Sequence, residues 1–129
     1  MPTEKSALKI RRATPLDAVN LYRMVVDDER KAGTELEFDE AARVAHILHI
    51  IASGYVSVVE KSGRIVGSFG FAAGGPEYAK NRVLVSEWCI LHPSLASTKV
   101  SDRLVERLLN FADEHGVAIQ ISAKAGGSQ

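Results

Sequence analysis

The sequence predicts a single α/β domain whose mixed sheet carries helices on both faces. The predicted elements follow the order β-α-α-β-β-β-α-β. Their last strand–helix–strand unit, Val83–Ala123, requires a parallel crossover, whereas the middle strands form an antiparallel meander. A length of 129 residues suits one domain with a real hydrophobic core. We therefore expect one domain over residues 1–129, with flexible ends at 1–7 and 124–129.

The first predicted elements are a strand and a helix. Leu8–Arg12 alternates between apolar and polar residues, as is typical of a half-buried strand. Thr14 can cap the next helix, Pro15 suits its first turn, and Asp17 faces the positive end of its dipole. The expected apolar stripe of this helix consists of Ala18, Leu21, Tyr22, Val25 and Val26.

A second helix is predicted from the cap Asp39 to about Ser53, where Gly54 ends it. Its apolar residues fall at helical spacing: Val44, Ile47, Leu48 and Ile51. Two antiparallel strands follow, Tyr55–Glu60 and Arg64–Ala72, with the turn residues Lys61–Gly63 between them.

The last third of the chain predicts a strand, a helix and a strand. Val83–His92 is nearly apolar throughout, which indicates a central strand covered on both faces. After a polar loop that begins at Pro93, an amphipathic helix is expected over Lys99–His115, and Gly116 ends it. Its apolar face consists of Val100, Leu104, Leu108, Phe111 and Ala112. Val117–Ala123 alternates as the final strand.

Composition excludes several classes of protein. Sixteen basic and sixteen acidic residues cancel, which argues against a nucleic-acid binder that depends on bulk phosphate neutralisation. The single cysteine, Cys89, cannot form an internal disulfide and suits a reducing compartment. No segment has the apolar length of a membrane-spanning helix, about 20 residues, or the pattern of a signal peptide. We expect a cytoplasmic protein.

The junction between the Val83–His92 strand and the next helix is the most informative place for function. A strand that leads through a short loop into a helix presents free N–H groups and the positive end of a helix dipole. Such a helix start can bind a phosphate or a pyrophosphate.

At this point the chain resembles the GNAT superfamily of acetyl-CoA-dependent N-acetyltransferases. The resemblance rests on the element order, the opening Ile10–Ala18, the return strand Gly63–Gly67 and the strand end Ile90–Pro93, and it covers residues 8 to 123. Ser86–Pro93 is also similar to small GNAT-like proteins encoded by phages. The resemblance implies a GNAT-like fold and acetyl-CoA as co-substrate.

The resemblance also implies which residues bind acetyl-CoA. The strand backbone around Cys89, Ile90 and Leu91 would bind the pantetheine arm, and the following loop would hold the pyrophosphate through Ala96, Ser97, Thr98, Lys99, Val100 and Ser101. Family members carry a cation and two glycines at the positions of Ala96, Lys99 and Ser101, and this chain has none of these in place. A non-glycine residue at positive φ costs about 1–2 kcal/mol, whereas a dipole–anion contact contributes about 0.3–1 kcal/mol. Lys99 could supply a substitute cation; alternatively, Ser97 or Thr98 only caps the helix.

Glu87 is the candidate general base, because amine acetylation requires removal of the ammonium proton. The alternative is a surface carboxylate paired with a basic side chain of a neighbouring strand. Glu77 and Tyr78 would line the acceptor pocket, or they are loop surface. Acidic residues between Asp27 and Asp39 favour a cationic acceptor, and no general acid is assigned.

Several other residues that could bind a metal or take part in catalysis are not expected to do so. His46 and His49 form an H-x-x-H pair, but no third ligand has matching spacing, so no metal site is expected. Cys89 is expected to be a small buried hydrophobe, and Trp88 a core residue. The last strand leaves an edge that a second copy could cover, which predicts a homodimer.

The sequence therefore predicts an N-acetyltransferase that moves an acetyl group from acetyl-CoA to an amine of a small molecule or a protein. The alternative is a catalytically inactive GNAT-like domain that acts in binding or assembly, for example in a phage particle. Fold alone does not decide between them.

Overall fold

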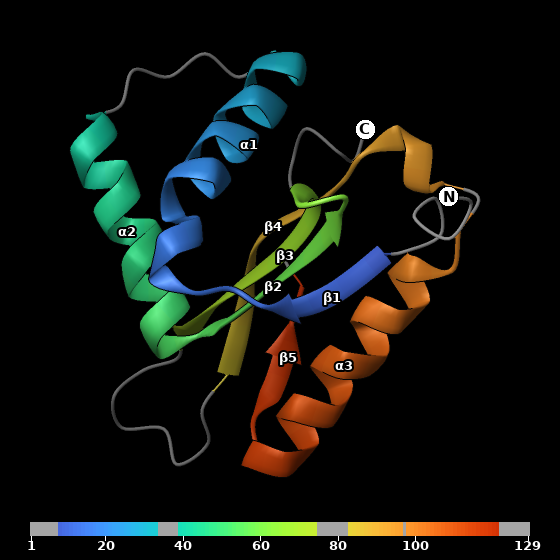
Figure 1. The fold of residues 1–129 in the computed structure, drawn as a ribbon. Helices are drawn as coiled ribbons and strands as arrows, with labels where there is room; N and C mark the ends of the chain where they lie inside the picture. Colours follow the sequence, from blue (N-terminus) through green and yellow to red (C-terminus); the bar gives the residue numbers. More distant parts are fainter. Residues whose placement is uncertain (1–7, 34–38, 75–82, 97, 122–129) are drawn as a thin grey trace.

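Helices cover both faces of the sheet: α1 (Ala18–Lys31) and α2 (Glu40–Ser53) lie on one face, and α3 (Val100–His115) lies on the other (Figure 1). The structure is a computed structural model, and it describes residues 8–33, 39–74, 83–96 and 98–121. Within these ranges, no helix combines the length and apolar character needed to span a membrane.

Five strands form one sheet in the order β1-β2-β3-β4-β5. Their bounds are Leu8–Arg12 (β1), Tyr55–Lys61 (β2), Arg64–Gly74 (β3), Val83–Leu91 (β4) and Ala118–Gln120 (β5). The first four pair antiparallel, and β5 pairs parallel to β4. The element order and the mixed sheet with helices on both faces confirm the predicted fold class.

Each face of the sheet has its own hydrophobic core. On the α1 and α2 face the buried residues are Ala18, Leu21, Val25, Ile47, Ile50, Val56, Val58 and Trp88. On the α3 face they are Ile10, Tyr55, Val59, Phe69, Phe71, Leu84, Leu95, Val100, Leu104 and Leu108. The predicted stripes of α1 and α3 are confirmed in their central residues.

The predicted stripe of α2 is wrong in one member. Ile47 and Ile50 are buried, whereas Leu48 is 37% exposed. Because apolar residues stand at 47, 48, 50 and 51, spacing alone cannot decide which side of this helix faces the sheet.

Two predicted helix ends are confirmed, Asp39 for α2 and Gly116 for α3, whereas Asp17 and not the predicted Thr14 directly precedes α1. The Asp39 side chain accepts hydrogen bonds from the backbone N–H groups of Ala41 and Ala42. Gly116 ends α3 with a φ of 63°, and its left-handed conformation suits glycine. The β2–β3 turn places Ser62 and Gly63 at positive φ, as a tight hairpin turn requires.

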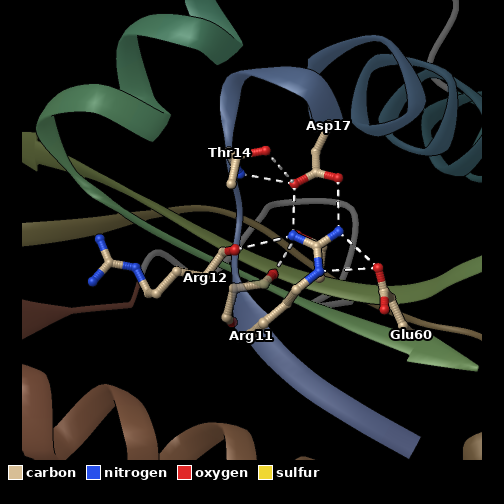
Figure 2. Close-up of polar contacts among 7 residues, drawn as sticks. Arg11, Arg12, Thr14, Asp17 and Glu60 are labelled. Atoms are coloured by element: carbon tan, nitrogen blue, oxygen red, sulfur yellow. Dashed lines mark hydrogen bonds and ion pairs between the residues drawn. The ribbon is translucent and has the colours of Figure 1, made fainter. Parts of the chain in front are cut away.

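The start of α1 is fixed by an ion-pair cluster that the sequence does not reveal. The Arg11 guanidinium on β1 donates to both carboxylate oxygens of Asp17 at 2.9 Å and to Glu60 Oε2 at 2.8 Å (Figure 2). Thr14 N–H also donates to Asp17 Oδ2, at 2.8 Å. Asp17, expected as a dipole partner, is therefore buried in a cluster that ties β1 and β2 to the chain entering α1.

Candidate active site

Strand β4 has a bulge at Glu87. Gly70 pairs with Trp88 and the next residue, Phe71, pairs with Ser86, so Glu87 has no partner on β3. A bulge inserts one extra residue and turns its side chain in a new direction. Here Glu87 Oε1 comes to 3.6 Å from Nε2 of His46, on α2. The bulge therefore presents a partly exposed carboxylate on the face of the sheet that α1 and α2 cover.

The residue after the bulge is anchored in the core. Trp88 Nε1 donates to Ser68 Oγ at 2.9 Å, and Ser68 Oγ donates to the carbonyl of Ser57 at 2.8 Å. This chain of bonds satisfies the buried indole N–H and links β4 to β3 and β2. The prediction that Trp88 belongs to the core is confirmed.

The C-terminal half of β4 has a backbone edge that β5 does not cover. In the described residues, β5 pairs only with Val83, Leu84 and Val85. An extended ligand can add to such an edge as an extra strand. The predicted pantetheine-binding residues Cys89, Ile90 and Leu91 all lie in this half of the strand.

Two expectations about β4 are wrong for the same reason. The strand is not covered on both faces along its length: only Leu84 and Trp88 are buried, and Cys89 is exposed. The apolar run predicts a central strand, but residue types alone do not show whether a helix covers each face along the whole strand. Partial burial raises the pKa of the Cys89 thiol, so this cysteine is not an activated nucleophile.

The loop after β4 avoids the backbone strain expected from its missing glycines. It forms a 3₁₀ turn, η3 (Pro93–Leu95), and neither Lys99 nor Ser101, which stand where the family has glycines, has a positive φ. The strain expected from non-glycine residues therefore does not arise at these two positions.

Most N–H groups of this loop are already bonded within the loop. Ser94 N–H donates to Nδ1 of His92, and the N–H groups of Leu95, Ala96 and Thr98 donate to carbonyls within it. Val100 N–H donates to Thr98 Oγ1 at 3.3 Å, which confirms that Thr98 can act as a cap. These groups do not form an open phosphate cradle.

A smaller set of donors remains at the start of α3. Within the described part of the chain, the N–H groups of Lys99 and Asp102 have no hydrogen-bond acceptor. The Lys99 side chain is exposed beside them, but so is the Asp102 carboxylate in the first turn. Val100 itself is buried, Ser101 is exposed, and Ser97 lies outside the described residues.

An open groove of about 830 Å³ runs between the C-terminal half of α1 and the β3 and β4 ends that face it. Its apolar lining includes Ile65, Val66, Ile90 and Leu91 from the two strands. Its charged lining residues are Arg23, Arg30, Lys31, Arg64, Asp27 and Asp28. The groove thus holds more cations than carboxylates. Glu77 and Tyr78, the predicted acceptor residues, lie outside the described residues.

The two histidines of the H-x-x-H pair have different surroundings. His46 faces Glu87, whereas the His49 backbone carbonyl accepts from Ser53 Oγ. No three metal-ligating side chains gather in the described residues. Sequence reasoning missed the His46–Glu87 pair, because no spacing rule connects residues 41 positions apart on a helix and a strand.

Comparison with known proteins identifies the fold. No protein-family model and no curated protein matches the chain. Solved structures do match, among them a predicted acetyltransferase with acetyl-CoA from Clostridium acetobutylicum, with a TM-score of 0.75 at 18% identity. The match covers 94% of this chain and 84% of the other.

The names of two further matching proteins state what they acetylate. A ribosomal-protein-alanine N-acetyltransferase from Brucella melitensis biovar Abortus matches with a TM-score of 0.69 at 16% identity, over 92% of this chain and 82% of that one. An aminoglycoside acetyltransferase from an uncultured soil metagenomic sample, in complex with sisomicin, matches with a TM-score of 0.70 at 16% identity, over 96% and 82%.

These matches show an acetyltransferase fold. The chain has the fold of the GNAT acetyltransferases, as its sequence predicted.

Proposed function

We propose that the protein transfers an acetyl group from acetyl-CoA to an amine of a small molecule or a protein. The main observation in support of this proposal is the bulge in β4. The bulge holds the Glu87 carboxylate beside the part of the β4 edge that β5 does not pair with. The fold supports the proposal, because acetyltransferases share it and one of the similar structures contains acetyl-CoA.

The pantetheine arm would bind along the uncovered edge of β4. The backbone of Cys89, Ile90 and Leu91 would pair with its amides as an additional strand does. This position brings the thioester toward the bulge, where backbone N–H groups near Ile90 and Leu91 would polarise its carbonyl.

The pyrophosphate would bind at the start of α3 through fewer donors than a glycine-rich loop provides. Lys99 supplies the cation, and the N–H groups of Lys99 and Asp102 supply donors. The Asp102 carboxylate opposes this binding. We therefore expect acetyl-CoA to bind with modest affinity.

The chemical step would be a direct transfer. Glu87 accepts one proton from the acceptor ammonium, and the neutral amine then attacks the thioester carbonyl carbon. The C–N bond forms, the C–S bond breaks, and the nitrogen loses its second proton. The departing CoA thiolate gains a proton, so that amide and free thiol leave. No described residue is assigned as the general acid.

The single cysteine gives a direct test of cofactor binding. Cys89 is exposed on the strand that would carry pantetheine, so acetyl-CoA should slow its alkylation by a maleimide at least several-fold. Acetyl-CoA at 100 times its dissociation constant should also stabilise the fold by about 2.7 kcal/mol, read as a rise in Tm. Unchanged alkylation and unchanged Tm at millimolar acetyl-CoA would instead support the inactive binding or assembly domain.

The homodimer stays a prediction. β5 is the last strand in the sheet order, and Ile121, just after it, is 70% exposed. Light scattering coupled to size-exclusion chromatography tests it, and a monomer at micromolar concentration would contradict it.

A further inference from the structure

The position of His46 opposite the bulge suggests a role that the H-x-x-H pattern does not. We infer that His46 acts through Glu87 as the residue that carries the acceptor's proton to solvent. This inference rests on the proposed acetyl transfer and adds to it the route by which the proton leaves. His46 would not touch the acceptor; it is a positioning and proton-exit residue.

The geometry of the pair supports this role. His46 Nε2 lies 3.6 Å from Glu87 Oε1, and Glu87 is the one β4 residue that the bulge leaves without a partner on β3. The two side chains differ in exposure, at 52% for His46 and 36% for Glu87. A proton received by the carboxylate therefore has a more exposed acceptor next to it.

The chemistry of the two groups also fits. An ordinary carboxyl group titrates near pH 4.3 and holds a proton poorly at neutral pH, whereas an ordinary imidazole titrates near pH 6.5. Imidazole is therefore the side chain best suited to take up a proton and release it to water under physiological conditions.

Two other ionisable groups lie one turn from His46 on the same helix. On α2, Arg43 lies one turn before it and binds Glu29 of α1, and His49 lies one turn after it. From the sheet, Glu87 is the one ionisable group that the described residues bring within ion-pair distance of His46. His46 thus has a specific acidic partner, and His49 has none among the described residues.

This difference makes His49 a matched control, because both histidines are exposed on the same helix. We expect His46→Gln to lower kcat about tenfold at pH 7 with an unchanged KM for acetyl-CoA. The pH–rate profile of this variant should differ from the wild-type profile, and added imidazole should restore part of the rate. His49→Gln should keep the wild-type profile.

Two comparisons decide the inference. In the Glu87→Gln background, His46→Gln should cause no further loss, because the pair acts as a unit. In NMR spectra, Glu87→Gln should move the His46 ring resonance and leave that of His49 in place. A His46→Gln enzyme with the wild-type pH profile, or a His46 ring resonance that ignores Glu87→Gln, would overturn the inference while the transferase proposal stands. A wild-type protein without Cys89 protection or turnover would overturn both.

Discussion

The indole ring of Trp88 lies directly over Gly70, so that a Cβ atom at residue 70 would stand 2.3 Å from the ring. Gly70 and Trp88 are register partners on β3 and β4, and the bulge that holds Glu87 begins one position further along. Gly70 thus leaves the space that the indole ring occupies. The close contact between these two residues fixes the strand beside the candidate base.

Gly70→Ala should therefore destabilise the fold. The added methyl group cannot fit without moving the ring, and such overpacking costs about 1–3 kcal/mol. Urea denaturation followed by circular dichroism measures the loss. In a Trp88→Leu background the same substitution should cost much less, because the ring is gone. An equal cost in both backgrounds would show that the contact with Trp88 is not the cause.

Ser68→Ala should destabilise the fold for a different reason. It removes the acceptor of the buried Trp88 N–H, and an unsatisfied buried donor costs about 1–3 kcal/mol. Unfolding can be followed by fluorescence, since Trp88 is the only tryptophan. The cost should fall in a Trp88→Phe background, measured by circular dichroism, because phenylalanine has no N–H. A cost independent of residue 88 would contradict the role of this bond.

Asp17 should make stability depend on pH in the acid range. Hydrogen bonds from Arg11 hold the pKa of the Asp17 carboxyl below its ordinary value, and the Thr14 N–H adds to this effect. Because this pKa is lower in the native state than in the unfolded chain, ionisation of Asp17 stabilises the fold. The stabilisation is fully present at pH values above the unfolded-chain pKa of about 3.9. That stabilisation is lost as the pH falls through the lower native value.

The Asp17→Asn variant tests the direction in which stability changes with pH. At neutral pH it should lose about 2–3 kcal/mol of unfolding free energy, because among the described residues the Arg11 guanidinium then keeps Glu60 alone as a charged partner. The difference from wild type should shrink below about pH 4. Asp27→Asn is the control, because its pair with Lys31 is exposed and should contribute less than about 0.5 kcal/mol. Urea titrations across this range give both values, and a pH-independent difference would contradict the argument.

Sequence patterns predicted the parts of this fold that depend on local rules. The cap at Asp39, the left-handed Gly116 and the α3 stripe each follow from a few neighbouring residues. The parts that were missed depend on contacts between distant residues. The bulge at Glu87 is visible only in the pairing of β4 with β3, and the exposure of Cys89 is visible only in the folded structure.

In the candidate site, too, the sequence predicted some residues, whereas contacts between distant residues were missed. Family resemblance pointed to Glu87 and to the β4 edge, and the structure adds the bulge and the His46 partner. The missing glycines of the loop predict backbone strain, but the loop avoids positive φ at Lys99 and Ser101 and bonds most of its own N–H groups. Loop hydrogen bonding of this kind follows from three-dimensional geometry that residue types alone do not specify.

Two charges at the start of α3 should affect acetyl-CoA binding in opposite directions. Lys99 and Asp102 are both exposed there, and an exposed charge–charge interaction is worth about 0.2–1 kcal/mol. We expect Lys99→Gln to raise the Kd for acetyl-CoA about two- to fivefold and Asp102→Asn to lower it by a similar factor. Isothermal titration calorimetry measures both values. Because these interactions are exposed, both effects should weaken as salt rises from low to physiological concentration. If the two substitutions changed the Kd in the same direction, or not at all, the pyrophosphate would bind elsewhere on the chain.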